Sequence, residues 1–292
     1  MTTITNYQVN AELALAAYSD LSAGMSEPDY IIALMNSERG MSQTQANDFA
    51  RNWYVLDQYD GQVEEFYIDE FGQEHTFLNP TGLNVTLFEH IATGEQVVAV
   101  RGTERTDLDD VQTDIIDIGL LGTAEWQSQY AAFNAKVREW LDSGTLQSGF
   151  SVTGHSLGGF LATNLAIDYP INIAHTYLYN APGVTGVAGG ILQAIHNTLS
   201  PDNSIGISNI LPISNIIASG DVVSSAGMYV STPIMMSVET RSPFGAHSIV
   251  TVTDALAIYN LFFSIDSRET LSDLSSILNA ASNRGNESLE TL

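Results

Sequence analysis

Apolar residues recur at two different spacings along this chain, and the change falls near residue 60. Before it, the spacing is helical and predicts helices over 7–20, 28–37 and 42–53, with Ser42 capping the third. Beyond it, short apolar runs are typical of strands. These predicted strands are 63–68, 76–78, 84–91 and 96–101.

The second half of the chain alternates strand-like and helix-like patterns. An amphipathic helix is predicted over 125–141, where aromatic residues at spacings of three and four indicate a core-facing stripe. Strands are expected at 150–153, 175–179 and 214–218, and a final helix over 254–263. This order is typical of an α/β protein with a mainly parallel central sheet flanked by helices.

Antiparallel strands are expected on the N-terminal side of this sheet. Thr93-Gly94 provides a hairpin turn between the strands predicted at 84–91 and 96–101. We therefore divide the chain into three parts. They are an N-terminal helical segment packed on the core, 1–60, the α/β domain, 61–270, and a C-terminal helix or linker tail, 271–292.

The composition is that of an acidic globular protein. Apolar residues make up 44% of the chain and charged residues only 15%, with a formal net charge of −25. This charge argues against nucleic acid as a partner and against electrostatic docking on anionic membranes. The chain has no cysteine, which excludes disulfides and thiolate metal sites.

The ends of the chain bear on its location. The first residues lack the basic and apolar regions of a signal peptide, and no run of 18 apolar residues is present. The polar stretch 283–288 is typical of a linker, so we expect one module of a longer polypeptide. A secreted, extracellular protein is expected, without an N-terminal signal peptide in this chain, and a cytoplasmic location is the alternative.

One motif organises the chemistry: Gly154-His155-Ser156-Leu157-Gly158, a G-x-S-x-G sequence. An apolar strand precedes it and an apolar helix follows it, which is the context of a nucleophile elbow. The glycines would let neighbouring backbone pack against the turn while Ser156 presents its hydroxyl at the edge of the sheet. No Gly-Lys-Ser/Thr or G-x-G-x-x-G pattern occurs here, which argues against a nucleotide site.

A serine nucleophile needs a histidine to accept its proton and a carboxylate to orient that histidine. On a sheet of this kind the acid and then the histidine follow the serine in the chain. Three histidines follow Ser156, and we favour His247, in a loop before the final helix, over His175 in a strand and His196 in an apolar segment.

For the acid we favour Asp221, which follows an apolar strand and a turn glycine and precedes His247. The other aspartates considered are less well placed. Asp168 is expected on the outside of a helix, Asp202 in a loop, and Asp254 comes after the histidine.

The negative charge that develops on a substrate carbonyl oxygen needs preorganised donors. The backbone N–H of Leu157, directly after the nucleophile, is the first candidate. Thr103 is the second, because it follows a buried strand and a glycine turn and offers both an N–H and a hydroxyl.

Taken together, these motifs resemble the class 3 lipase family, especially lipase modules of large secreted bacterial proteins. The resemblance covers roughly residues 84–263 and implies an α/β-hydrolase fold, the triad Ser156, Asp221 and His247, and oxyanion donors Thr103 and Leu157. It also implies that Asp114 is a structural carboxylate near the site. The motifs are Val98-Ala99-Val100-Arg101-Gly102-Thr103, Gln112-Thr113-Asp114, Val152-Thr153-Gly154-His155-Ser156-Leu157-Gly158-Gly159, Tyr179-Asn180-Ala181-Pro182-Gly183, Gly220-Asp221-Val222-Val223 and His247.

The substrate implied by this resemblance is a lipid ester at an interface, cleaved by a triacylglycerol lipase. Phospholipase A1 is the alternative activity, and a non-catalytic binding module on a hydrolase scaffold is the alternative of another class. The glycine-rich apolar segment 184–213 is either a lid or a buried helical excursion. No cofactor is required by this chemistry. The aspartates between 107 and 117 are candidates for calcium, although a solvated acidic loop is favoured.

Overall fold

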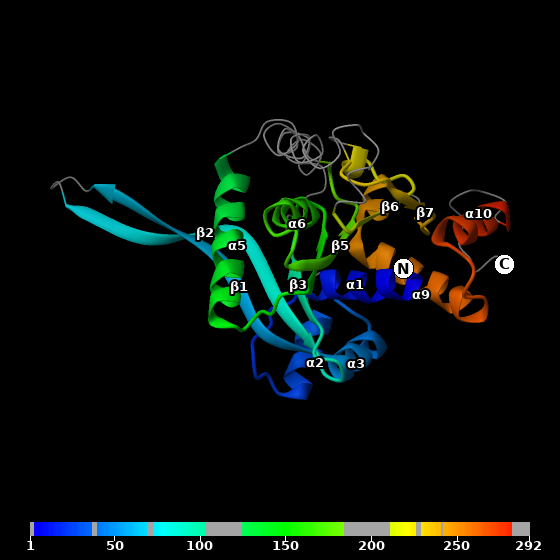
Figure 1. Ribbon diagram of the computed structural model, residues 1–292, viewed down its shortest axis with the longest axis horizontal. Helices are drawn as coiled ribbons and strands as arrows, with labels where there is room; N and C mark the ends of the chain where they lie inside the picture. Colours follow the sequence, from blue (N-terminus) through cyan, green and yellow to red (C-terminus); the bar gives the residue numbers. More distant parts are fainter. Residues whose placement is uncertain are drawn as a thin grey trace.

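A computed structural model describes residues 3–36, 40–68, 73–102, 124–183, 211–225, 229–240 and 242–281. Its centre is a seven-stranded sheet whose strands lie side by side in chain order (Figure 1). The first three strands pair antiparallel, and the pairs from β3 to β7 are parallel. The predicted α/β class, with antiparallel strands on the N-terminal side, is confirmed. The strands are β1 Trp53–Ile68, β2 Glu74–His90, β3 Gln96–Val100, β4 Phe150–His155, β5 Ile173–Tyr179, β6 Ile213–Ala218 and β7 Ile234–Met236.

The first two strands are much longer than predicted. β1 and β2 pair from Trp53 opposite His90 to Ile68 opposite Glu74, and together they extend beyond the helices as an arm (Figure 1). Register shifts between Val55 and Asp57 and after Asp60 let the ladder continue through irregular positions. The prediction of separate short strands was wrong in extent, because bulges absorb interruptions that break the apolar pattern.

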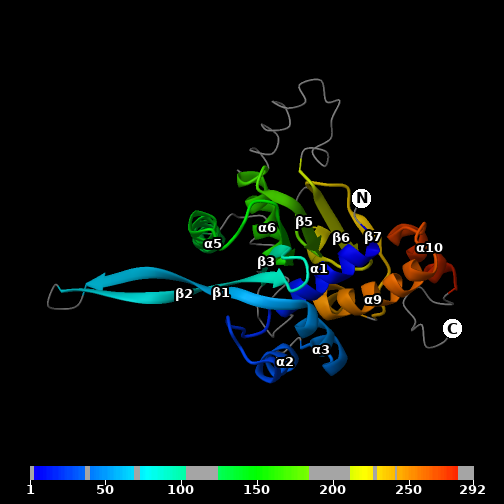
Figure 2. The same cartoon turned by 60° about the horizontal axis from the view of Figure 1, so that its bottom comes forward.

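Helices cover both faces of the sheet (Figure 2). α1 and α9 lie on one face, and α5 and α6 lie on the other. The helical predictions are confirmed with shifted ends. The helices are α1 Ile4–Ala16, α2 Glu27–Asn36, α3 Gln43–Asn52, α5 Ala124–Ser143, α6 Leu157–Asp168, α8 Pro243–His247, α9 Ile249–Ile265 and α10 Leu271–Ala281.

The two faces divide the core into two clusters of buried side chains. In β3, Val97 and Ala99 belong to the cluster that contains α1 and α9, and Val98 and Val100 belong to the cluster that contains α5 and α6. Alternate residues of a strand point to opposite faces, so a strand buried on both sides is a continuous apolar run. This burial explains why residues 97–100 form an uninterrupted hydrophobic run.

The N-terminal helices begin where the sequence provides caps. The Ser42 side chain accepts the N–H of Gln45, and the Gln45 side chain accepts the N–H of Ser42, which is a capping box. Thr3 and Asn6 make the same exchange at the start of α1. No helix in the described ranges is both long and apolar enough to span a bilayer.

Candidate active site

Ser156 stands on a sharp turn between β4 and α6. Its backbone angles, φ 56° and ψ −128°, are rare for a residue with a side chain. Its N–H donates to the carbonyl of Tyr179 at the end of β5, at 3.0 Å. The strand, turn and helix predicted around the motif are present, and the turn has the strained geometry of a nucleophile elbow.

The glycines of the motif allow close packing around this turn. A Cβ atom at Gly154 would collide with the backbone of Gly158 and Gly159. A Cβ atom at Gly158 would collide with the backbone of Val100 and Arg101, at the end of β3. The motif glycines are therefore required because three backbone segments meet at the elbow.

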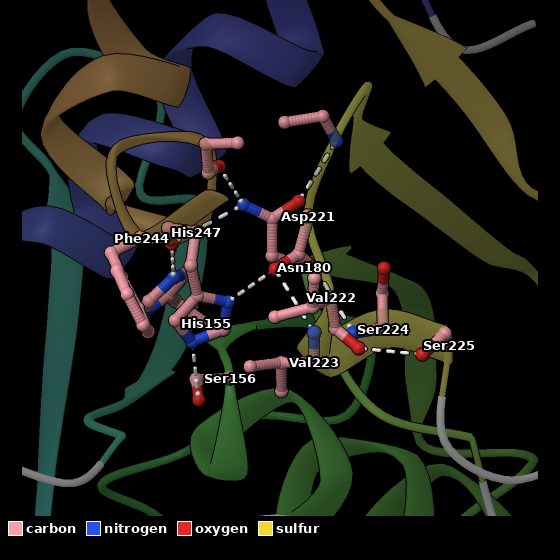
Figure 3. A network of polar contacts seen from close by, with 12 residues as sticks. His155, Ser156, Asn180, Asp221, Val222, Val223, Ser224, Ser225, Phe244 and His247 are labelled. Carbon is pink, nitrogen blue, oxygen red and sulfur yellow. Dashed lines mark hydrogen bonds and ion pairs between the residues drawn. The ribbon is translucent and has the colours of Figure 1, made fainter. Parts of the chain in front are cut away.

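The His247 side chain lies between Ser156 and Asp221 (Figure 3). Its Nε2 lies 3.0 Å from Ser156 Oγ, and its Nδ1 lies 2.9 Å from an oxygen of Asp221. The histidine side chain is 9% exposed and the Asp221 side chain is fully buried. His247 ends the short helix α8 and does not lie in an open loop, so its backbone is fixed. The structure thus brings Ser156, His247 and Asp221 together.

Asp221 is held by the turn that follows β6. One carboxylate oxygen accepts the N–H of Val223 at 3.2 Å, and the other accepts the N–H of Ser224 at 3.0 Å. Burial acts to raise the pKa of Asp221, but the hydrogen bond and charge of His247 and the bonds from Ser224 outweigh it. The net effect lowers the pKa of Asp221 below its ordinary value. Asp221 is therefore an anion that can orient His247.

The competing residues lie elsewhere or outside the described ranges. His175 lies near the start of β5, at the end of the sheet opposite Ser156, and its Nε2 is 2.9 Å from Ser214 Oγ. Asp168 bonds Tyr130 and Asn134 at the end of α6. Asp254 bonds Gln45, and His196 and Asp202 lie outside the described residues.

Asn180 is a supporting residue to which the sequence alone assigns no role. It directly follows β5 and adopts φ 47°, a left-handed conformation that asparagine tolerates better than most residues. Its amide nitrogen donates to the carbonyl oxygens of Ala246 at 2.8 Å and His247 at 3.3 Å (Figure 3). An asparagine after an apolar strand was the available signal, but its partner 66 residues away was not readable.

The predicted oxyanion donors are only partly within the described residues. Leu157 is the first residue of α6, so its backbone N–H has no acceptor within that helix, and its role as an oxyanion donor stays a prediction. Gly102 lies next to the elbow, since a Cβ atom there would be 3.2 Å from Ser156 Cβ. Thr103 and Asp114 lie outside the described residues, so their roles stay predictions.

The predicted calcium ligands and lid also fall largely beyond the described ranges. Residues 107–117 lie in the gap 103–123, and 184–210 of the segment 184–213 lie in another. Within the parts of the chain that the structure describes, no three acidic or histidine side chains gather as a metal site.

The fold is similar to those of solved lipase structures. Lip2 lipase from Yarrowia lipolytica is 18% identical, with a TM-score of 0.53 over 83% of this chain and 82% of that chain. Lipase II from Rhizopus niveus is 14% identical, with a TM-score of 0.43 over 76% and 75% of the two chains. In sequence, no family model and no curated protein matches. The likeness to Lip2 confirms the predicted α/β-hydrolase fold.

Proposed function

We propose that this protein is a serine carboxylic-ester hydrolase that acts on lipid esters through Ser156, His247 and Asp221. The observation that carries the proposal is the continuous hydrogen-bond chain from Ser156 Oγ through His247 to Asp221, with distances of 3.0 and 2.9 Å. A serine in strained elbow geometry at its head supports the same assignment. The likeness in fold to a lipase agrees with it.

The first half-reaction is acyl transfer to the enzyme. Ser156 Oγ attacks the ester carbonyl carbon while His247 Nε2 accepts the hydroxyl proton. The carbonyl oxygen gains negative charge, which the N–H of Leu157, and by the predicted arrangement Thr103, would stabilise. His247 then gives the proton to the departing alcohol, and an acyl-enzyme remains.

The second half-reaction releases the acid. His247 Nε2 takes a proton from water, the hydroxide attacks the acyl carbon, and the proton returns to Ser156 as the ester bond breaks. Asp221 stays ionised throughout, holds His247 Nδ1–H and stabilises the imidazolium. The lowered pKa of Asp221 supports this role.

Triacylglycerol is the substrate class we favour over phospholipid. A net charge of −25 opposes binding to anionic phospholipid surfaces, whereas an uncharged ester surface carries no such repulsion.

The test is hydrolysis of p-nitrophenyl butyrate with labelling by a fluorophosphonate probe. Ser156→Ala is expected to lose labelling and to lower kcat by about a million-fold, as loss of a triad nucleophile does. Ser151→Ala, which alters a buried serine of β4, is the matched control and should keep both. Hydrolysis by Ser156→Ala at the wild-type rate would refute the assignment.

The substrate class is tested separately on emulsified tributyrin and on vesicles of phosphatidylcholine mixed with anionic phosphatidylglycerol. Faster fatty-acid release from tributyrin is expected. Faster release from the phospholipid vesicles, with the fatty acid taken from the sn-1 position, would instead identify a phospholipase A1. Binding of either lipid without hydrolysis or probe labelling would favour a non-catalytic module.

A further inference from the structure

Tyr18, two residues beyond α1, lies between two parts of the candidate site. Its side chain is buried, and its hydroxyl accepts the N–H of Gly102 at 3.2 Å. The same hydroxyl lies 2.9 Å from Nδ1 of His155, the residue before Ser156. A tyrosine from the N-terminal segment thus contacts both the end of β3 and the elbow.

The His247 carbonyl sets which atom donates in the hydrogen bonds of His155 and Tyr18. His155 Nε2 lies 2.6 Å from the backbone carbonyl oxygen of His247, and a carbonyl only accepts. Nε2 therefore carries a proton. In a neutral imidazole Nδ1 then accepts, so the Tyr18 hydroxyl donates to it. One chain results, from Gly102 N–H through Tyr18 and His155 to the His247 carbonyl.

The two ends of this chain belong to the parts of the site that must stay in register. Gly102 precedes Thr103, the predicted oxyanion donor, and the other end is the backbone of His247. His155 is fully buried, so these bonds form away from competing water. Displacements of about 1 Å in a preorganised site reduce rates by about a hundredfold.

We propose that Tyr18 and His155 are positioning residues that fix the backbone at Gly102 and His247 relative to Ser156. Neither side chain takes part in bond making, and each acts through backbone groups of the site. The inference rests on the proposed hydrolase function and adds the N-terminal segment to the machinery that supports it.

Tyr18→Phe is the central test, because it removes the hydroxyl and keeps the ring. The expected result is a kcat for p-nitrophenyl butyrate lower by about 10- to 100-fold, with KM changed less than about twofold. Values of kcat are expressed per serine labelled by a fluorophosphonate probe, so that misfolded protein does not count. The matched control is Tyr259→Phe, in α9. It removes the hydroxyl of a buried tyrosine that donates to the backbone carbonyl of Ser237 at 2.9 Å.

His155 offers a second test by conservative rescue. In His155→Gln the side-chain amide can still donate to the His247 carbonyl, whereas the leucine of His155→Leu has no donor. We expect Gln to retain several-fold more kcat than Leu. Adding Tyr18→Phe to His155→Leu should lower kcat little further, because the chain is already broken.

The outcomes separate this inference from the proposed function. A wild-type protein with neither hydrolysis nor probe labelling would overturn both. Normal wild-type activity with an unchanged kcat in Tyr18→Phe would overturn the positioning role alone. The positioning role would also be overturned if Tyr259→Phe lost as much kcat as Tyr18→Phe, since the effect would then be general destabilisation.

Discussion

The side-chain oxygen of Asn180 accepts the backbone N–H of Ala218 at 2.8 Å, so a residue that follows β5 is bonded to the last residue of β6. The amide nitrogen of the same side chain donates to the carbonyl of Ala246 at 2.8 Å. One buried side chain therefore connects the sheet to the helix that ends at His247. Asp221 follows the end of β6, to which Asn180 is bonded. Asn180 therefore also fixes His247 relative to Asp221.

Replacing Asn180 tests this connection. Asn180→Gly keeps the left-handed backbone at φ 47° without strain but removes the side-chain bonds, so kcat should fall about tenfold or more. Asn180→Asp should be worse, because its carboxylate would place oxygen against the Ala246 carbonyl. Ester hydrolysis and urea unfolding measure both effects. Wild-type kcat in Asn180→Gly would show that the side chain does not position His247.

Asp221 should make stability depend on pH in one direction. Its pKa in the folded protein is lowered, so its ionised form stabilises the fold above the ordinary aspartate pKa of about 4. That contribution is lost as the pH falls through the lowered folded-state pKa. Asp221→Asn removes the titration. The difference in unfolding free energy between wild type and Asp221→Asn should be full at pH 7 and shrink below about pH 4.

Asp254 is the control of opposite sign. Burial raises the pKa of Asp254, so its ionised form slightly opposes folding, and Asp254→Asn should be neutral or stabilising at pH 7.

Asp221→Asn should also lower kcat by about ten-thousandfold, as expected when the histidine loses its orienting anion. A difference between wild type and Asp221→Asn that grows in acid would contradict the assigned charge state.

Gly158 should tolerate no side chain. Alanine at this position would drive its Cβ into the backbone of Val100 and Arg101, and overpacking of this kind costs about 1–3 kcal/mol. Gly144→Ala is the control, because its Cβ would meet no atom within 4 Å and only the φ of 76° is unfavourable. Thermal unfolding and kcat should both be affected more by Gly158→Ala than by Gly144→Ala. Equal effects of the two variants would show that the close contact between Gly158 and the end of β3 is not needed for stability or activity.

Local sequence carried enough information for the elbow and for a mainly parallel sheet with antiparallel strands on its N-terminal side. Ser156 was identifiable because its strand, glycines and helix are contiguous, and Asp221 and His247 followed from the order that the fold requires. Strand lengths were not readable where bulges interrupt the pattern, as in β1 Trp53–Ile68. β7 Ile234–Met236 was missed because three residues carry too short a pattern.

The support of the site was less predictable than the triad. Tyr18 lies 137 residues before His155, and its position reads as the apolar end of a helix. Only the packing of α1 against β4 brings the hydroxyl to the elbow. A hydrogen bond between distant segments leaves no periodic signal in either one, which is why these positioning residues emerge from the structure alone.

The strain at Ser156 gives a final test that does not depend on catalysis. Its backbone, at φ 56° and ψ −128°, lies in a region that costs a residue with a side chain about 1–3 kcal/mol. Ser156→Gly relieves this strain, and the greater freedom of glycine in the unfolded chain offsets roughly 0.5–1 kcal/mol of the gain. Ser156→Gly should therefore unfold with a free energy about 1 kcal/mol higher than Ser156→Ala, although both lack the hydroxyl. Urea unfolding of the two variants at one pH measures this difference. If Ser156→Ala were the more stable variant, the backbone at Ser156 would not be strained. The strained elbow geometry would then no longer support Ser156 as the nucleophile.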